Sequence, residues 1–257
     1  MNKLLGKRAL VTAGAQGIGL AISEQLLEAG CDVVVHYRSS ADAARKLTDK
    51  ARTLGRRCSV ISADLTETEE CNRLVAAALE FLGGLDVLIN NAGSLIARRS
   101  FANADDEFWA ETMSLNLGSV RRVTRAAAPH LAKAAKTGGG ASIVNLSSLA
   151  GRKGGHTGSL AYATAKGAIL TFTRALATEL GPQGIRVNAL APGFIVGTSF
   201  HNTHTTPEAA RATVTTIPIG RAGTAADVAR AAVYFASEYD GFITGATLDI
   251  NGGVYAC

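Results

Sequence analysis

Hydrophobic positions along this chain fall into two alternating patterns. Seven short runs are nearly continuous in Val, Ile, Leu and Ala, and longer stretches with helical spacing lie between them. Strands that read as uninterrupted apolar runs are expected where both faces of a parallel sheet are buried. The seven runs are RALVTA (8–13), DVVVHY (32–37), CSVISA (58–63), DVLINN (86–91), ASIVNLS (141–147), IRVNALA (185–191) and ATLDIN (246–251).

The stretches between the first strands are amphipathic and long enough for crossover helices. They cover residues 17–30, 43–55 and 67–83. Strands that alternate with helices of this length favour βαβ units and a parallel sheet. No linker, repeat or low-complexity block divides the chain. We therefore expect an α/β fold: a single doubly wound Rossmann domain over residues 1–257, with a seven-stranded parallel sheet and helices on both faces.

Composition and charge exclude several classes of protein. The chain is 47% hydrophobic and 18% charged, as in ordinary globular proteins. Its formal net charge of +5 is spread without a basic run, which argues against a nucleic-acid partner. The densest basic spot, Arg121, Arg122 and Arg125, is interpreted as a solvated helix face.

The sequence predicts neither a membrane segment nor a metal site. No segment approaches the roughly 20 apolar residues that cross a bilayer, and the N-terminus has no apolar run of signal-peptide length. The four cysteines show no CxxC spacing. His201 and His204 lie three apart without an evident third ligand, so we expect no metal there. A cytoplasmic location is expected.

A glycine-rich turn follows the first strand. Gly14, Gly17 and Gly19 lie between that strand and the first helix, in VTAGAQGIGLA. Glycines at this place let the backbone approach a pyrophosphate, whose charge the helix N-terminus favours. The strand–turn–helix context predicts a dinucleotide site, which would include Gln16 and Ile18.

The end of the second strand bears on the choice of cofactor. Arg38 lies nineteen positions after Gly19, where an acidic residue would bind the ribose hydroxyls of NAD. Tyr37, Arg38 and Ser39 instead offer a guanidinium and hydroxyl groups, which suit a 2′-phosphate. The sequence therefore favours NADP. The alternative is that Arg38 is merely exposed or stacks on adenine, with both cofactors used.

Three further features should meet at one crevice. The fourth strand ends in Asn91, Ala92 and Gly93, and the fifth ends in Ser147 and Ser148. Tyr162 and Lys166 follow, one helical turn apart in the small-residue stretch SLAYATAK, without a neighbouring carboxylate. In open α/β sheets the ligand lies outside the carboxyl ends of the strands, so we expect all these groups to face it.

Together these motifs resemble the short-chain dehydrogenase/reductase family, over essentially the whole chain. The resemblance rests on the turn at 12–19, Asp64 after the third strand, Asn-Ala-Gly at 91–93, Asn116, the Ser–Tyr–Lys set, Pro192-Gly193 and the closing ITGATLDINGG (243–253). It implies an NAD(P)-dependent oxidoreductase that moves hydride between nicotinamide and a carbonyl or secondary alcohol. It also implies these cofactor residues: Asp64, Leu65, Asn91, Ala92, Gly93, Tyr162, Lys166, Pro192, Gly193, Ile195 and Thr198.

The resemblance implies four catalytic residues: Asn116, Ser148, Tyr162 and Lys166. Tyr162 would exchange a proton with the substrate oxygen, Ser148 would hydrogen-bond that oxygen, and Asn116 would support a proton-relaying water. Lys166 would hold the nicotinamide ribose. A free tyrosine has a pKa of about 10. We expect the Lys166 ammonium and an oxidised nicotinamide to lower the pKa of Tyr162 toward working pH.

The chain departs from the family pattern at a few positions. Thr12-Ala13 stands where the family usually has Thr-Gly, and we expect the turn to survive because alanine is the smallest change. Gln16 stands where NADP-dependent relatives often carry a basic residue. Ser148 is chosen over Ser147 because Gly151 follows it at the usual distance.

Two loops, 152–160 and 193–218, should flank the substrate. The second is rich in Thr, His and Asn, which predicts a small polar substrate such as a sugar or polyol. His156 could contact it or be incidental. One alternative is a 3-oxoacyl-acyl-carrier-protein reductase, which the closing segment resembles; Gln183 weakens that reading, and Arg174 and Lys136 keep it open.

A second alternative, a non-catalytic nucleotide-sensing scaffold, has no reason to retain all four catalytic residues. The family resemblance also implies a homotetramer formed through helices around 105–136 and 158–180. The second of these helices has a small-residue face that such packing would use, made of Ala161, Ala165 and Ala168.

Overall fold

The seven expected strands form one parallel sheet. The computed structural model describes residues 4–38, 41–198 and 206–256. The strand order is β3-β2-β1-β4-β5-β6-β7, so the chain reverses direction across the sheet between β1 and β4. The expected α/β class is confirmed. The strands are β1 Arg8–Val11, β2 Asp32–Tyr37, β3 Cys58–Ser62, β4 Val87–Asn90, β5 Ala141–Leu146, β6 Ile185–Pro192 and β7 Thr247–Ile250.

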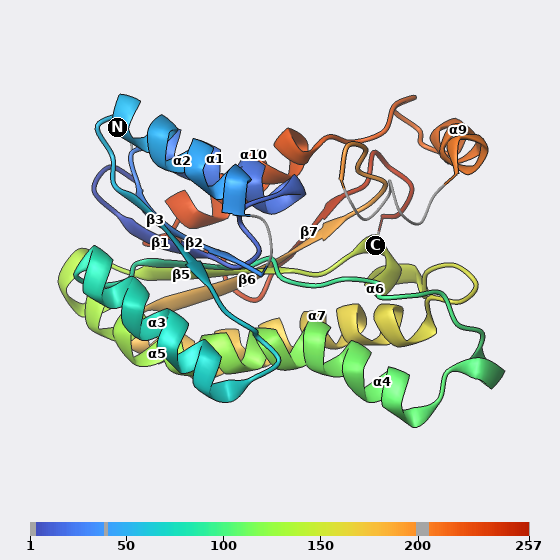
Figure 1. Ribbon diagram of the computed structural model, residues 1–257, viewed down its shortest axis with the longest axis horizontal. Helices are drawn as coiled ribbons and strands as arrows, with labels where there is room; N and C mark the ends of the chain where they lie inside the picture. The colour runs from blue at the N-terminus through green and yellow to red at the C-terminus, as the bar shows by residue number, and fades with distance from the viewer. Residues whose placement is uncertain (1–3, 39–40, 199–205, 257) are drawn as a thin grey trace.

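Helices cover both faces of this sheet, as Figure 1 shows. One layer is formed by α1 (Gly17–Glu28), α2 (Ala41–Thr53) and α10 (Ala225–Ser237). The other is formed by α3 (Thr68–Leu82), α5 (Ser119–Gly138) and α7 (Leu160–Leu180). Each strand is joined to the next strand along the chain through at least one helix, so the sheet is built from βαβ units.

Alternate residues of the strands enter two separate cores. On β2, Val33 and Val35 pack in the core under α1 and α10, whereas Val34 packs in the core under α3 and α5. Side chains on a strand point alternately to opposite faces. The continuous apolar runs of the sequence are thus explained, because both faces of the central strands are covered.

The remaining elements lie mostly at the carboxyl end of the sheet. They are η1 (Phe101–Asn103), α4 (Asp106–Met113), η2 (Ser114–Gly118), α6 (Leu149–Lys153), η3 (Gly181–Gln183) and α9 (Pro207–Thr215). Segment η2 is a π-helical turn between α4 and α5. The expected long helix around Asn116 is therefore interrupted at that residue, and such π-turns are frequent at functional sites.

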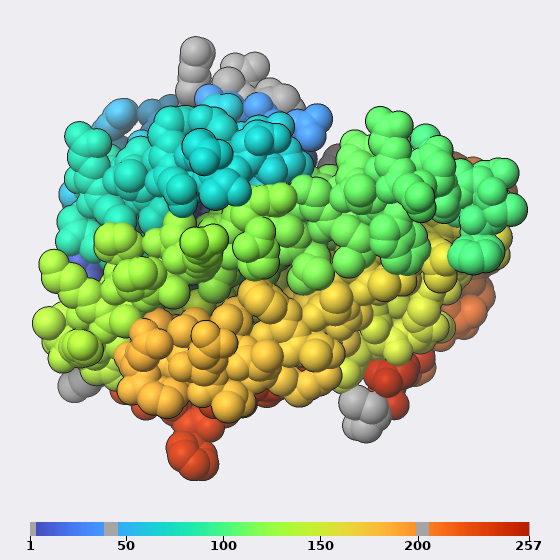
Figure 2. All heavy atoms as spheres, turned by 90° about the horizontal axis from the view of Figure 1, so that it is seen from below, coloured from blue at the N-terminus to red at the C-terminus, as the bar shows by residue number. Residues whose placement is uncertain are grey.

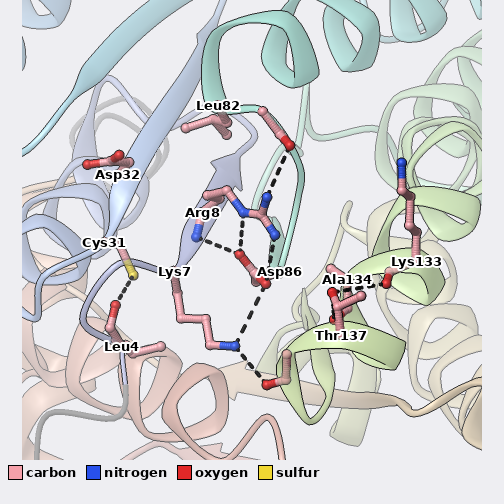
Figure 3. A network of polar contacts seen from close by, with 12 residues as sticks. Leu4, Lys7, Arg8, Cys31, Asp32, Leu82, Asp86, Lys133, Ala134 and Thr137 are labelled. Atoms are coloured by element: carbon pink, nitrogen blue, oxygen red, sulfur yellow. Dashed lines mark hydrogen bonds and ion pairs between the residues drawn. The ribbon is translucent and has the colours of Figure 1, made fainter.

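The opposite end of the sheet is closed by ion pairs (Figure 3). The Nε atom of Arg8 lies 2.7 Å from Oδ2 of Asp86, and Nζ of Lys7 lies 3.8 Å from its Oδ1. The Asp86 side chain is 4% exposed. Because Arg8 begins β1 and Asp86 directly precedes β4, this network fixes the amino ends of two central strands, away from the crevice.

Two of the three residues of the small-residue face expected on α7 pack inside their own chain: Ala161 and Ala165 are 3% and 0% exposed. The third, Ala168, is partly exposed. The helices α5 and α7 nevertheless run side by side on one face of the molecule (Figure 2). Among the described residues, no helix combines the length and apolar character that a bilayer crossing requires.

Candidate functional site

A cleft of about 630 Å³ opens at the carboxyl end of the sheet. Its walls come from the glycine-rich turn, the loop after β4, the ends of β5 and β6, and the helices α6, α7 and α9. Twelve of the predicted catalytic and cofactor-binding residues line it: Gln16, Gly17, Ile18, Asn91, Gly93, Ser148, Tyr162, Lys166, Pro192, Gly193, Ile195 and Thr198.

The other predicted site residues that the structure describes are not among those that line this cleft. They are Gly14, Gly19, Leu65, Ala92 and Asn116, together with Tyr37, Arg38 and Asp64, which follow or end the strands β2 and β3. Ser39, His201 and His204 lie outside the described residues.

The turn after β1 forms with alanine at its first position. Ala13 has a φ of 47°, in the left-handed region that favours glycine. Its backbone N–H donates to Nδ1 of His36 over 2.9 Å, and Nε2 of His36 lies 3.0 Å from the carbonyl oxygen of Ala63. Because Nδ1 accepts this hydrogen bond it carries no proton, so Nε2 is the donor to Ala63; burial lowers the pKa of His36 in the same sense. This histidine holds Ala13 in its strained conformation.

The glycines of the turn serve close packing. A Cβ on Gly14 would lie 2.8 Å from Oγ of Ser23, inside the core, so Gly14 faces away from the cleft. A Cβ on Gly19 would collide with the carbonyl oxygen of Ala13 and the side-chain amide of Asn91. The first turn of α1 therefore lies directly against the loop, as a pyrophosphate site at a helix N-terminus requires.

Thr12 and Asn91 join this turn to the loop after β4. The hydroxyl of Thr12 accepts hydrogen bonds from the backbone N–H groups of Asn91 (2.9 Å) and Ala92 (3.0 Å). The Asn91 amide donates to the carbonyl oxygens of Thr12 and Ala13, each over 3.1 Å. Asn91 and Ala92 thus hold the loop after β4 against the glycine-rich turn.

The two serines at the end of β5 have different environments. Ser147 is buried and its Oγ donates to the carbonyl oxygen of Lys166 over 2.7 Å, which ties β5 to α7. Ser148 begins α6, where its Oγ accepts from the N–H of Ala150 over 3.1 Å and it also hydrogen-bonds Tyr162. The structure therefore supports the choice of Ser148 as the serine that acts with the tyrosine.

Lys166 is held beneath Tyr162 in the wall of the cleft. Its Nζ donates to the carbonyl oxygen of Leu146 over 2.8 Å and lies 5.8 Å from the centroid of the Tyr162 ring. Only 3% of Lys166 is exposed. Burial lowers its pKa to about 8. The ammonium thus lies close to the Tyr162 ring, and no Asp or Glu occurs among the described residues that line the cleft.

The pKa of Tyr162 is shifted in the direction opposite to the one expected. Burial raises it to about 12, and the hydrogen bond with Ser148 opposes this rise only in part. Lys166 is buried and Tyr162 partly buried, an environment that disfavours the anionic phenolate and that no sequence pattern predicted. In the chain by itself, the Tyr162 phenol therefore keeps its proton at neutral pH and is a poor base.

Asn116 acts on the site through the loop after β4. Its Oδ1 accepts from the N–H of Ser94 over 3.0 Å, and its Nδ2 donates to the Ser94 carbonyl oxygen over 2.8 Å. A Cβ on Gly93 would lie 2.7 Å from this Oδ1 and 2.9 Å from Nζ of Lys166. Gly93 therefore leaves the space into which the asparagine and the lysine converge.

Arg38 and Asp64 neighbour one another at the ends of β2 and β3. Asp64 Oδ1 accepts from the N–H of Thr66 (2.9 Å) and from its hydroxyl (2.7 Å). These bonds, and to a smaller degree the charge of Arg38, lower the pKa of Asp64. Arg38 is exposed, so its guanidinium is open to an anion from solvent.

The substrate end is more apolar than the sequence predicted. Both expected loops contribute to it, the first through Lys153, Gly155, His156 and Ser159 and the second through α9 and Ile217. Bulky apolar side chains also line it, because residues outside those loops reach the cleft: Leu95, Leu149 and Val254.

Sequence reasoning missed His36 and Arg98. His36 acts through contacts with residues 23 and 27 positions away, which no local pattern reveals. Arg98 lines the cleft from the segment between Gly93 and α4, which carries no motif. A basic residue shortly after Asn-Ala-Gly was the one available signal for it.

Comparisons with known proteins agree with this geometry. Residues 12–255 match a family model described as enoyl-(acyl carrier protein) reductase. The 3-oxoacyl-[acyl-carrier-protein] reductase FabG of Staphylococcus aureus is 33% identical over 249 residues, which cover 97% of this chain and 98% of that protein.

Two solved structures superimpose over nearly the whole chain. An NADH-dependent reductase, A1-R′, responsible for alginate metabolism, is 37% identical, with a TM-score of 0.91 and full coverage of both chains. A short-chain dehydrogenase from Burkholderia cenocepacia J2315 in complex with NADP is 34% identical, with a TM-score of 0.89 and coverage of 99% of this chain and 100% of that one.

Proposed function

The chain belongs to the short-chain dehydrogenase/reductase family of NAD(P)-dependent oxidoreductases, and from this premise we propose that it interconverts a small polar carbonyl compound and its secondary alcohol. The observation that carries the proposal is that Ser148, Tyr162 and Lys166 meet in one cleft with the glycine-rich turn. A likeness to a reductase of alginate metabolism favours a sugar-like or polyol-like substrate.

The residues of the cleft fit a nicotinamide nucleotide. The absence of a side chain at Gly19 lets the start of α1 lie directly against Asn91, and its absence at Gly93 lets Lys166 approach the loop after β4. The turn residues Gln16, Gly17 and Ile18 would hold the pyrophosphate at the start of α1, and Pro192, Gly193, Ile195 and Thr198 would hold the nicotinamide end. Such a nucleotide, when bound, supplies or accepts the hydride.

We favour NADP over NAD. The exposed guanidinium of Arg38 at the end of β2 suits a 2′-phosphate, and no acidic residue stands at that strand end to bind ribose hydroxyls. Related structures include an NADH-dependent enzyme and a complex with NADP, so both cofactors occur among the relatives.

Tyr162 is the proposed proton donor. A phenol whose pKa is raised by burial stays protonated at neutral pH, which suits reduction of a carbonyl. Ser148, which already hydrogen-bonds this phenol, would donate to the same substrate oxygen as negative charge develops there. Lys166 would provide the positive charge beneath the ring and bind the ribose, while Asn116 positions the loop of Gly93 and Ser94 and would support a proton-relaying water.

The test is a screen of carbonyl compounds and alcohols that follows the absorbance of NADPH and, separately, NADH. It includes sugars, polyols and acetoacetyl thioesters. The proposal expects turnover of a hydroxylated carbonyl compound with NADPH. Absence of turnover with every compound and both cofactors, in protein that binds NADPH, would favour the non-catalytic scaffold instead.

The 3-oxoacyl-acyl-carrier-protein reductase is the second candidate. The family model and the 33% identity to FabG favour it, as do the exposed side chains of Arg174 and Lys136, which could meet an acidic carrier. Gln183, also exposed, occupies a position where such reductases tend to be basic. Higher kcat/KM for acetoacetyl thioesters than for any sugar would select this candidate.

We also propose that the chain forms a homotetramer, in which α5 and α7 meet their counterparts in other copies. The proposal rests on the family resemblance and on the side-by-side exposure of these helices (Figure 2). Light scattering coupled to size-exclusion chromatography measures the mass directly: four times 26.5 kDa is expected, and a monomeric mass contradicts it.

A further inference from the structure

The substrate end of the cleft carries basic side chains and no described acidic one. Arg98, Lys153 and His156 line it, and neither Asp nor Glu occurs among the described residues of its wall. The cleft is therefore positively charged beyond the contribution of Lys166.

The three basic groups gather on one rim. Lys153 ends α6 and His156 follows three residues later. Arg98 Nη1 donates to the carbonyl oxygen of Thr157 over 3.2 Å, so the segment that carries it lies against the loop after α6. Each of the three is exposed to solvent in the open cleft.

The arginines next to Arg98 and Lys153 in the sequence both form ion pairs with carboxylates. Arg99 pairs with Asp105 (2.9 Å), and Arg152 pairs with Asp249 (2.6 Å). Arg98 and Lys153, each directly adjacent to one of these, form no ion pair with any described residue. Arg98 and Lys153, which line the cleft, are thus cations without a carboxylate partner among the described residues.

The wall contributed by α9 is neutral. Ala209, Ala212 and Thr213 line the cleft, whereas the charged Glu208 of the same helix pairs with Arg211 and does not line it. A nucleotide would not neutralise the rim, because its phosphates belong at the glycine-rich turn, on the other side of Tyr162 and Lys166.

We propose that the substrate carries an anionic group, a carboxylate or a phosphate monoester, away from its reacting carbon, and that Arg98 and Lys153 bind that group. The inference rests on the proposed oxidoreductase function and names the substrate class within it. A guanidinium and an ammonium form charge-assisted hydrogen bonds to either anion. His156 lies where it adds a further hydrogen bond.

The experiment compares each anionic substrate with an uncharged counterpart. The carboxylate arm is 4-oxopentanoate, a ketone, against its methyl ester, and the phosphate arm is fructose 6-phosphate against fructose, each with saturating NADPH. The variants are Arg98→Gln, Lys153→Gln and the double variant, with Lys133→Gln, an exposed lysine on α5 outside the cleft, as the matched control.

We expect the anionic member of at least one arm to have a kcat/KM about 10-fold above its neutral partner, the size of one charge-assisted hydrogen bond. The double variant should lower kcat/KM for the anionic partner about 10-fold more than for the neutral partner and so abolish the preference, and Lys133→Gln should keep it. The arm that shows the preference identifies carboxylate or phosphate. Equal kcat/KM within both arms, or a preference that the double variant keeps, overturns the inference.

A binding measurement separates this inference from the proposed function. Calorimetric titration of unreactive succinate and inorganic phosphate into the NADPH complex does not need turnover. Binding of either anion by the wild type and its loss in the double variant supports the anion site even if no substrate is reduced. Turnover of neutral carbonyl compounds without any anion binding upholds the function and contradicts the site.

Discussion

The ammonium nitrogen of Lys166 lies 5.8 Å from the centroid of the Tyr162 ring, and both side chains are withdrawn into the wall of the cleft. Burial acts on them in opposite directions, raising the pKa of the phenol to about 12 and lowering that of the ammonium to about 8. Each group is therefore pushed toward its neutral form. Burying this pair costs folding stability, and such costs are common at functional sites.

Replacing Lys166 with Met should stabilise the fold while it removes activity. Below pH 8 the folded state carries the full cost of a buried ammonium. Between pH 8 and 10.5 the folded chain loses this proton while the unfolded chain keeps it, so the stability of the wild type rises. Relative to Lys166→Met, its free energy of unfolding should rise by about 2 kcal/mol from pH 7.5 to 9.5.

Urea unfolding at the two pH values measures this difference. The control is Lys133→Met, which removes an exposed lysine and should track the wild type at both. A difference between wild type and Lys166→Met that stays constant with pH would mean that Lys166 titrates normally in the folded chain.

Gly93→Ala should reduce activity by crowding the convergence of Asn116 and Lys166. The added methyl would lie 2.7 Å from the Asn116 Oδ1 and 2.9 Å from the Lys166 Nζ, so one of them must move. Overpacking of this kind costs about 1–3 kcal/mol, and we expect kcat/KM to fall about 10-fold or more. Gly181→Ala is the matched control, because nothing lies within 4 Å of its Cβ position and its φ is −53°. Equal activity of the two variants would show that the space beside Gly93 is not needed.

Ala13→Gly should be tolerated or stabilising, although most alanine-to-glycine changes destabilise. Ala13 has a φ of 47°, in the left-handed region, which costs alanine about 1 kcal/mol because of its Cβ. Glycine adopts the same φ without this cost, and the gain offsets the larger backbone entropy that glycine loses on folding. Ala110→Gly, at an exposed position within α4, should instead lose about 1 kcal/mol. Thermal unfolding of both variants measures the contrast, and the same loss in both would contradict the strained turn.

Arg38→Ala should raise the KM for NADPH and leave that for NADH nearly unchanged. If the guanidinium binds the 2′-phosphate, its loss removes a charge-assisted hydrogen bond, equivalent to about 10-fold in KM or more. Steady-state kinetics with both cofactors measure the ratio, with Arg125→Ala on α5 as the control for lost charge. Equal effects on the two cofactors would remove the basis for favouring NADP.

The fold could be predicted from the sequence because its signal is spread over whole elements. Apolar runs such as DVVVHY read as buried strands, and the structure confirms why: Val33, Val34 and Val35 alternate between two cores. The cleft residues of the turn and of the Tyr–Lys helix could also be located, because these motifs directly follow or begin an element.

Features that depend on contacts between distant segments could not be predicted. The bond from His36 to Ala13, which fixes a strained turn, has no local pattern. Ala161 and Ala165 look like a partner-binding face in sequence, but the chain covers them itself. The direction of the Tyr162 pKa shift was wrong for the same reason, since the sequence shows which residues are present and not how deeply each is buried.

The most direct test of the central claim, that Tyr162 supplies the proton, is the kcat of Tyr162→Phe with the best substrate of the carbonyl screen. Because general acid catalysis contributes about 10²–10⁴-fold, we predict a fall in kcat of that size. The Kd for NADPH, measured by fluorescence titration, should change far less than kcat, since only a hydroxyl is lost. Near-normal kcat in a variant that binds NADPH would contradict the account, because the proton would then come from another group.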